Sequence, residues 1–367
     1  MGRTLKIIII LLLFLGFATV LCGGVIFIIS GGNPLNFAQK TLIRISLSGR
    51  EADLNRSVSS DATPIRFTVA PGDTPRVIAQ NLVIANLIND AALFVDYVQL
   101  NDYDRQLEAG TYFLNQAQTL SQIAFALTDS RSSQFPFRIL EGWRIEEVAE
   151  AIDNNPYFGF SGTDFLNVVG PGAQVDPNFA AQVGLPAGSS LEGFLYPDTY
   201  QLPAEVTVTM LRDLLMQAFL DNVGTQLPLD AAAQGFSLYQ MVSLASIIQR
   251  EAVHPDEQPL IASAYRNRLA IGQRLEADPT IQYAIGYRDG TWWPRITAAN
   301  YSDVISPYNM YLNDGLPPSP IASPGITAIR AAVYPAESNY YYFRADCRSD
   351  GYHEFATTFE EHVANGC

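Results

Sequence analysis

The chain contains 367 residues, 48% of them hydrophobic, and this length and apolar content suffice for two or three domains with cores of their own. Its formal net charge of -15 argues against a nucleic-acid partner, because the phosphate backbone would repel so acidic a chain. Only 16% of the residues are charged, which favours a neutral polymer over a charged one as substrate.

An apolar segment fills most of residues 1–30 and has only small or weakly polar interruptions. It is long enough to cross a bilayer, so we expect an uncleaved transmembrane helix behind a short tip. Arg3 and Lys6 precede it, which predicts a single-pass protein of the plasma (inner) membrane with a cytoplasmic N-terminus and the remaining chain outside. A cleaved signal peptide is the alternative, but its apolar core is normally shorter. The large Leu21 before Cys22 disfavours a lipoprotein.

Residues 31–64 are rich in Ser, Asn and Gly and are predicted to form a stalk or linker. A small αβ subdomain is expected over residues 65–134. Its first residues alternate as a strand does, and Thr74 is placed to cap a helix with Pro75 in its first turn. The next elements are expected as a helix at 91–100, a strand at 108–113 and a helix opening at Thr119 or Ser121.

The strand, the turn Pro71–Thr74 and the following helix resemble the start of LysM modules. The resemblance implies binding to the N-acetylated sugars of cell walls. Residues 135–152 repeat the order of strand, turn and amphipathic helix, and residues 135–190 are expected to bridge to a larger mixed α/β domain over residues 191–367. The predicted class is therefore α+β.

The decapeptide Leu191–Tyr200 places one carboxyl group, that of Glu192, beside a glycine and among aromatic residues. In such a partly dry setting the charged form is disfavoured and the pKa of a carboxyl group rises. A protonated carboxylic acid is what cleavage of a glycosidic bond requires, because the leaving oxygen must be protonated near neutral pH. The alternative is a tight turn whose aromatic side chains fill a core.

Residues 237–252 are predicted to form a buried helix, since apolar residues cover much of its surface. Glu251 continues an apolar line at the end of this helix, where the helix dipole disfavours a negative charge. Such a carboxylate needs a function or a partner, and the candidate partners for a structural ion pair are Arg250, Arg266 and Arg268. Another helix is expected at about 257–271, and residues 274–280 are interpreted as a loop.

The chain has three cysteines and three histidines. Cys347 and Cys367 lie in the C-terminal tail, where a chain outside the membrane is permitted a disulfide, although the sequence does not fix the distance between them. There is no HExxH or CxxC pattern, so we expect neither a metal site nor a cofactor.

Seven sequence blocks in this order resemble the endolytic murein transglycosylases, the YceG-like family. They are LEGFLYPDTY at 191, LASIIQREA at 244, AYRNRL at 264, RLEADPTIQYA at 274, SPYNMY at 306, GLPPSPIASPG at 315 and DGYHEF at 350. The resemblance covers roughly residues 60 to 365, behind the predicted membrane anchor. Methionine stands at 310 where the family often has threonine, and Gln249 and Arg250 differ from the pairs common in other members.

The resemblance implies that Glu192 is the catalytic acid and base, that peptidoglycan glycan strands are the substrate and that wall synthases are partners. We expect further side chains to bind the substrate; these are Tyr196, Asp198, Thr199, Tyr200, Glu251, Asn267, Asp278, Tyr308 and Asn309.

In the implied reaction Glu192 protonates the oxygen between N-acetylmuramic acid and N-acetylglucosamine and then takes the proton of the C6 hydroxyl, which closes on C1. The product end is a 1,6-anhydro sugar, and a second carboxylate is not required. Two alternatives stay open. One is a muramidase that uses water and a second carboxylate such as Asp198 or Glu251, and the other is a non-catalytic wall-binding scaffold.

Overall fold

The computed structural model describes residues 33–130 and 133–366. The chain divides between Gln134 and Phe135 into two compact units. The predicted membrane segment lies outside the described residues. Among those that are described, no single helix meets the length and hydropathy expected of a membrane span; the helices Gln226–Ala233 and Leu238–Glu251 meet them only as a pair bent by 97°.

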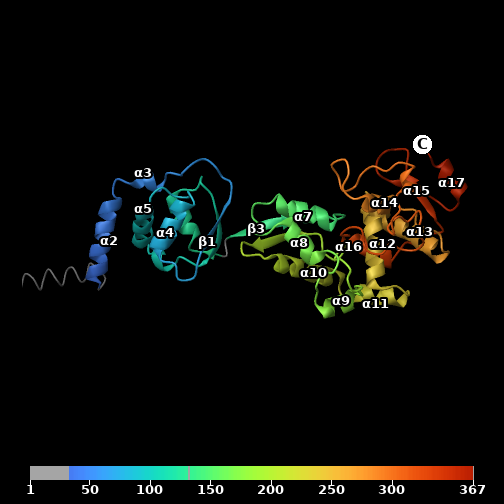
Figure 1. The fold of residues 1–367 in the computed structure, drawn as a ribbon, viewed down its shortest axis with the longest axis horizontal. Helices are drawn as coiled ribbons and strands as arrows, with labels where there is room; N and C mark the ends of the chain where they lie inside the picture. The colour runs from blue at the N-terminus through green and yellow to red at the C-terminus, as the bar shows by residue number, and fades with distance from the viewer. Residues whose placement is uncertain (1–32, 131–132, 367) are drawn as a thin grey trace, which may run out of the picture. The chain divides into compact units, whose positions relative to one another are not determined.

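The first unit is built on an antiparallel pair of strands, β1 (Ile65–Val69) and β2 (Gly110–Leu114), in which Phe67 lies opposite Tyr112. The predicted strand at 65–69 and helix at 91–100 are confirmed. Thr74 caps the first helix as expected, because its side chain accepts a hydrogen bond from the N–H of Val77. The helices that follow the two strands are α4 (Pro75–Ile84), α5 (Ala91–Leu100) and α6 (Leu120–Ala126), with a 3-10 turn at Tyr103–Arg105 (Figure 1).

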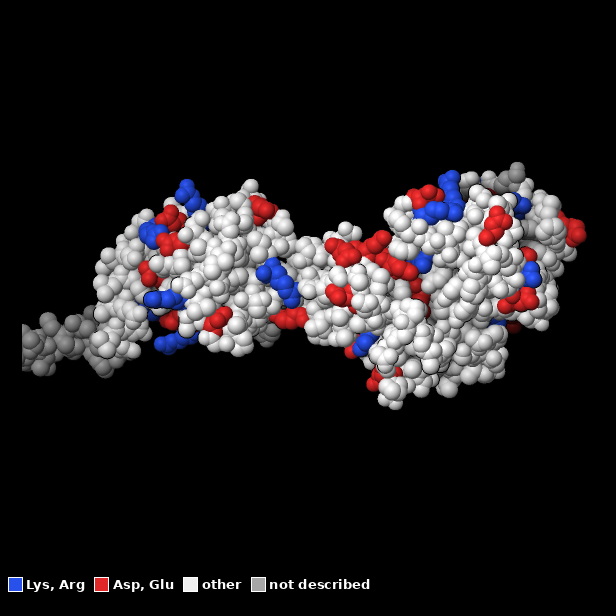
Figure 2. All heavy atoms as spheres, in the orientation of Figure 1, with Lys and Arg blue, Asp and Glu red and all other residues white. Residues whose placement is uncertain are grey.

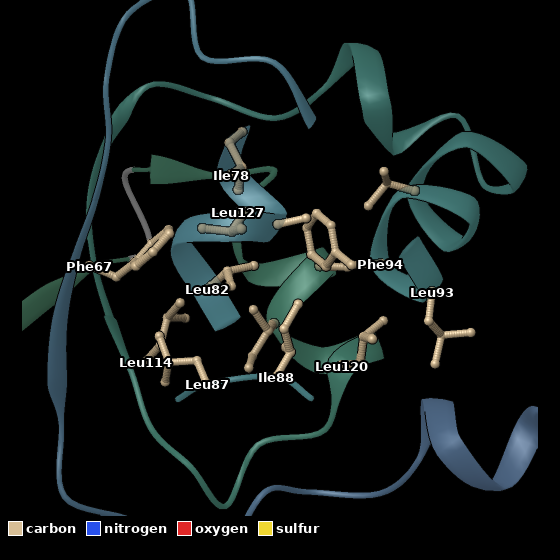
Figure 3. Close-up of a cluster of buried hydrophobic side chains, with 14 of the residues drawn as sticks. Phe67, Ile78, Leu82, Leu87, Ile88, Leu93, Phe94, Leu114, Leu120 and Leu127 are labelled. Carbon is tan, nitrogen blue, oxygen red and sulfur yellow. The ribbon is translucent and has the colours of Figure 1, made fainter. Parts of the chain in front are cut away.

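Figure 3 shows the core of this unit, in which Ile78 and Leu82 of α4 lie among aliphatic and aromatic side chains from the strands and the other helices. Leu82, Phe94 and Leu127 are completely buried. The three helices and the strand pair therefore share one hydrophobic core, which sequence periodicity alone anticipates.

The expected stalk needs correction. Residues 31–64 include two helices, α2 (Pro34–Leu47) and α3 (Glu51–Leu54), and α2 packs against α5. Ile43 and Leu47 follow each other on one helical face and belong to the same buried cluster as α4 and α5. Other apolar residues of α2, such as Leu42 and Ile45, are exposed, so the apolar pair did not stand out as one face. The first unit therefore begins earlier in the chain than the sequence indicated.

The second unit is mainly helical, with two short strand pairs. The strand β3 (Gln134–Arg138) pairs with β4 (Thr199–Pro203), and β5 (Tyr342–Ala345) pairs antiparallel with β6 (His353–Ala356). The helices are α7 (Ile145–Asp153), α8 (Gly162–Val169), α9 (Pro177–Val183), α10 (Val208–Val223), α11 (Gln226–Ala233), α12 (Leu238–Glu251), α13 (Gln258–Ala270), α14 (Asp278–Ile285), α15 (Asn300–Asp303), α16 (Ile326–Val333) and α17 (Phe359–Ala364), with a 3-10 turn at Pro255–Glu257 (Figure 1).

The helix α12 forms the centre of this unit and packs against α11, α13, α14 and α16. Its first turn is fixed by a capping box between Ser237 and Gln240, and its residues from Leu238 to Ile248 include ten that are buried. The predicted buried helix is thus confirmed. Strand β3 comes from the expected bridging segment and β4 from the expected catalytic domain, so residues on both sides of position 190 belong to the same unit. The chain is an α+β protein.

One segment that was interpreted as a loop is helical. Asp278 and Pro279 occupy the first turn of α14, where an acidic side chain and a proline both suit the unpaired N–H groups of a helix start. The stretch before them is irregular, as expected, and Leu275 and Ala277 within it are buried.

If α2 is part of the hydrophobic core of the first unit, truncation of Leu47 to alanine will destabilise this unit by about 2–4 kcal/mol, because it removes a buried side chain. The matched control is Leu42→Ala on the same helix, whose side chain is 68% exposed and whose loss should cost less than about 0.5 kcal/mol. Chemical denaturation of the full chain, with hydrogen exchange of the β1 and β2 amides reporting on this unit, measures both. Equal effects of the two substitutions would contradict the placement of α2.

Candidate active site

Glu192 lies in a tight turn between α9 and β4. The N–H of Leu191 donates to the carbonyl of Val169, and the N–H of Phe194 donates back to the carbonyl of Leu191. Phe194 is completely buried and its ring stacks on that of Tyr239 from α12, with centroids 5.6 Å apart. The aromatic side chain after the motif's glycine therefore fills the core, and the turn is anchored on both sides of Glu192.

Gly193 has a backbone conformation and a setting that only glycine accommodates. Its φ angle is +84°, and a Cβ added there would lie 2.4 Å from Cβ of Pro320 and 3.0 Å from Cγ1 of Val242. The turn thus packs directly against α12 and against the proline-rich loop 315–320. Pro320 of that loop thus packs against the Glu192 turn.

The carboxyl group of Glu192 is removed from water, with an exposed fraction of 0%. Its Oε2 accepts a hydrogen bond of 3.3 Å from the N–H of Ile145, the first residue of α7, while its Oε1 has no partner among the described residues. Burial raises the pKa of Glu192 to about 8, and the negative charge of Glu146 acts in the same direction. The Arg144 guanidinium and the Ile145 N–H oppose the rise in pKa. Desolvation prevails, so the group is largely protonated at neutral pH.

The start of α7 supplies most of the charges around this acid. Figure 2 shows acidic side chains gathered over α7, which carries Glu146, Glu147 and Glu150 within about one and a half turns. Glu146 forms an ion pair with Arg144 at 3.1 Å. These two side chains shift the pKa of Glu192 in opposite directions, so their effects largely cancel. This leaves burial as the main influence on the acid.

An aromatic and cationic cluster surrounds Arg144, which is itself buried. Its guanidinium lies over the ring of Tyr283 at 4.1 Å and over Trp292 at 4.9 Å. The indole N–H of Trp292 donates to Glu150, and that of Trp293 donates to Glu147, each at 2.9 Å. The segment that carries the two tryptophans is thereby attached to the helix whose N-terminus contacts Glu192.

Arg250 from the end of α12 completes this cluster. Its guanidinium lies 3.8 Å from the ring centre of Trp293, and its Nη1 donates to the carbonyl of Gly142 at 3.4 Å. Sequence reasoning missed Arg144, Tyr283 and both tryptophans as neighbours of the site. The adjacent pair Trp292–Trp293 was the available signal, but nothing in the sequence placed it near position 192.

The other predicted residues of the decapeptide do not hydrogen-bond Glu192. The hydroxyl of Tyr200 donates to the carbonyl of Tyr196 at 2.6 Å, and both rings are buried. Asp198 is exposed, and its side chain accepts a hydrogen bond of 2.7 Å from the N–H of Thr199. Its backbone carbonyl accepts a hydrogen bond from the N–H of Ile139. The Asp198 carbonyl thus bonds the backbone directly after β3, and the predicted contact of these four residues with substrate stays a prediction.

Two of the predicted binding residues, Asn309 and Asn267, use their side-chain amide groups to donate hydrogen bonds to backbone carbonyls. Asn309 is completely buried and its Nδ2 donates to the carbonyls of Tyr301 and Val304. Asn267 donates to the carbonyls of Ser338 and Tyr340 at 2.9 Å each. Both asparagines therefore brace loops.

Tyr308 is a predicted residue that contacts the aromatic cluster around Arg144. Its ring centre lies 4.8 Å from that of Tyr283, and its hydroxyl is 2.7 Å from that of Ser319 in the proline-rich loop. It therefore connects the loop that packs on Gly193 with the tyrosine that contacts Arg144.

The expected ion pair of Glu251 is wrong. Its Oε1 accepts a hydrogen bond of 2.7 Å from the hydroxyl of Tyr265, and none of the described arginines lies within ion-pair distance. Burial raises the pKa of Glu251 to about 7, against the smaller effect of Tyr265. Asp278 accepts a similar bond of 2.7 Å from Tyr311, and burial also raises its pKa. Both acids line one cavity of about 560 Å³.

The family model described as "YceG-like family" matches residues 67–366. The chain belongs to the YceG-like family.

Three relatives of this YceG-like chain show how far the similarity extends. An endolytic murein transglycosylase of Bacillus subtilis is 28% identical over 315 residues, which cover 82% of this chain and 83% of the relative. One of Streptococcus pneumoniae is 25% identical over 81% of this chain but only 57% of its own length. The crystal structure of a YceG-like protein of Listeria monocytogenes has a TM-score of 0.55 and 29% identity, covering 83% of this chain and 99% of that one.

The predicted disulfide of this YceG-like chain involves one residue outside the described range, Cys367. The Sγ of Cys347 lies 3.9 Å from the carbonyl oxygen of Asn365, two positions before it. The pairing of Cys347 with Cys367 stays a prediction.

A comparison of Gly193→Ala with a control glycine separates the cost of the close contact in the turn from the cost of the positive φ angle. The substitution combines a positive φ angle with a collision against Pro320, so we expect a loss of about 3–5 kcal/mol in the free energy of unfolding. Gly188→Ala is the matched control, because Gly188 has a φ of +81° and no atom within 4 Å of the added Cβ, and it should cost about 1 kcal/mol. Denaturant titration of both variants measures the difference, and equal losses would contradict the close contact.

Glu192→Gln is expected to stabilise the protein at alkaline pH. The folded pKa of about 8 lies above the ordinary value of 4.5, so the folded state favours the protonated acid and loses stability as the pH rises from about 4.5 through 8. The glutamine variant lacks this loss, so its free energy of unfolding should exceed that of the native chain by on the order of 3–5 kcal/mol at pH 9. This difference in stability should shrink towards pH 4. Urea titrations at several pH values measure it, and a gap that does not change with pH would refute the buried-acid assignment.

Proposed function

We propose that this chain is a membrane-anchored endolytic peptidoglycan transglycosylase that cleaves nascent glycan strands without water. The observation that carries the proposal is the complete burial of one acid in the Leu191–Tyr200 turn: Glu192 has no exposed surface and a pKa of about 8, so it holds a proton at neutral pH. Family membership and two relatives named endolytic murein transglycosylase support the same activity.

The first step needs an acid, and burial provides one. Glu192 donates its proton to the glycosidic oxygen between N-acetylmuramic acid and N-acetylglucosamine, and the bond from that oxygen to C1 breaks. The positive charge that develops at C1 lies next to the new Glu192 carboxylate. The Ile145 N–H and the Arg144 guanidinium, which both favour the ionised form, stabilise this carboxylate.

The second step needs a base, and the same group provides it. The Glu192 carboxylate takes the proton of the C6 hydroxyl of the muramic acid sugar, and the C6 oxygen forms a bond to C1. The acid returns to its protonated form, and the fragment ends in 1,6-anhydro-N-acetylmuramic acid. Protons balance over the cycle, and no water is consumed.

A hydrolytic muramidase would need a second carboxylate to activate water or attack C1. The carboxylates that influence Glu192 are those of Glu146 and Glu147, and both are engaged: Glu146 with Arg144, and Glu147 with the indole of Trp293. Asp198 and Glu251, the candidates from the sequence, make their hydrogen bonds elsewhere, Asp198 to the N–H of Thr199 and Glu251 to the hydroxyl of Tyr265. This arrangement favours the single-acid mechanism.

We further propose that residues 1–30 anchor the chain in the plasma membrane with the catalytic domain outside, and that the LysM-like unit contributes to glycan binding. These proposals rest on the apolar N-terminal segment and on the order β1, α4, α5, β2. Proximity to wall synthases rests on family resemblance alone.

Incubation of the full chain, purified in a mild detergent, with uncrosslinked murein glycan tests the activity. Mass spectrometry should show internal fragments with anhydro ends, one water lighter than reducing ends, and Glu192→Gln should lower their formation by at least 1,000-fold, on the order expected for loss of an essential acid. Glu337→Gln, at an exposed carboxylate, is the matched control and should leave the rate unchanged. Reducing ends would identify a hydrolase instead, and binding without cleavage by the native chain would favour the scaffold.

A further inference from the structure

The cavity of about 560 Å³ beside Glu251 has the size and lining of a small-molecule site. It is formed by the ends of α12 and α14, by α13 and by the strand β5 and helix α17. The reaction at Glu192 uses none of its residues.

Two carboxyl and tyrosine pairs give the cavity its polar groups. Tyr265 donates to Oε1 of Glu251, and Tyr311 donates to Oδ1 of Asp278, each at 2.7 Å. Within the described chain, the second oxygen of each carboxyl group makes no hydrogen bond. Each pair therefore holds its carboxyl group in a fixed position and leaves one acceptor oxygen for a ligand that brings hydroxyl or amide donors.

Carboxyl groups outnumber guanidinium groups in the lining of the cavity. Arg268 donates to the carbonyl oxygens of Tyr341 at 2.5 Å and Leu275 at 2.6 Å, and Arg344 donates to the carbonyl of His362 at 3.4 Å. Against these two cations stand the three carboxyl groups of Glu251, Glu276 and Asp278, so a carboxylate or phosphate ligand would meet an excess of negative charge. The charge distribution therefore favours a neutral ligand with many donors over an anionic one.

Aromatic rings supply flat apolar surfaces beside these acceptors. Tyr301 and Tyr311 stack with their centres 4.3 Å apart, and both line the cavity together with Tyr342 and Phe343. Aromatic faces next to fixed hydrogen-bond acceptors suit a sugar ring, which presents C–H groups on its faces and hydroxyl groups at its rim.

Two helices connect this cavity with the Glu192 site. On α12, Glu251 lines the cavity while the preceding Arg250 contacts Trp293. On α14, Asp278 lines the cavity while Tyr283, about 7.5 Å further along the helix axis, contacts Arg144. The cavity thus lies next to the catalytic cluster in the same compact unit, close enough for one polymer strand to contact both.

We propose that this cavity is a remote subsite that binds a neutral N-acetylated sugar unit of the glycan strand whose scissile bond lies at Glu192. The inference rests on the proposed function for the identity of the polymer. Its role is to add binding energy for long strands, away from the reacting bond, which gives an endolytic enzyme a preference for strand interiors.

Binding of peptide-free glycan strands to the full chain, in detergent and in the Glu192→Gln background, tests the subsite without turnover. Glu251→Gln and Asp278→Asn each remove an ionisable acceptor at nearly constant shape, and each should raise Kd about tenfold, the usual effect of losing a hydrogen bond to a charged group. Glu337→Gln is again the matched control and should leave Kd unchanged. Melting curves establish that each variant is folded. If one of the two variants does not fold, the other still tests the subsite.

The same two substitutions, made with Glu192 intact, should raise KM for long strands with kcat changed less than twofold. An unchanged Kd in both variants overturns the subsite, as does an effect limited to strands that carry peptide stems. A collapse of kcat at unchanged Kd would assign Glu251 to the chemistry and also overturn it. If the native chain fails to cleave but the Kd shifts appear, the proposed activity fails while the glycan-binding cavity stands.

Discussion

Removal of the Glu192 carboxyl group from water is the constraint on which the second unit depends. An isolated buried carboxylate costs several kcal/mol, so the fold keeps this group protonated at neutral pH. The burial is achieved by close packing: Gly193 lets the turn approach Pro320 and Val242, and Phe194 locks it into the core against Tyr239. The loop 315–320 and the helix α12 therefore both pack against the turn and keep the Glu192 carboxyl group out of water.

The charges around Glu192 are balanced so that the acid can also become a base. Glu146 favours the protonated form, whereas Arg144 and the Ile145 N–H favour the carboxylate, and all three belong to the start of α7. A strongly cationic neighbourhood would ionise the group before it met a substrate, and a purely apolar one would leave no stabilisation after proton transfer. The ion pair of Arg144 with Glu146 keeps the local field small, so that burial sets the pKa while the helix N-terminus stabilises the anion.

The sequence predicted the parts of this arrangement that follow from local pattern. Thr74, the capped helices and the apolar stripe of α12 obey short-range rules, and Glu192 stood out through its glycine and aromatic neighbours. Contacts between distant residues could not be derived in this way. Arg144 lies 48 positions before Glu192, and only tertiary packing brings it there. The same holds for Tyr265, whose hydroxyl replaces the arginine partner expected for Glu251. Ile43 and Leu47 were missed because the apolar residues of α2 do not share one face: Leu42 and Ile45, for example, are exposed, which weakens the periodic signal.

Complete burial also fits a reaction that must not use water. The carboxylate left after the first step lies next to an electrophilic C1, and a water molecule there would convert the transglycosylase into a hydrolase. Because Glu192 has no exposed surface, the glycan reaches it only when neighbouring side chains move. Such a rearrangement costs free energy, which contacts along a polymer strand can supply away from the reacting bond. The strand that gains access to Glu192 in this way then fills the space that water would otherwise enter.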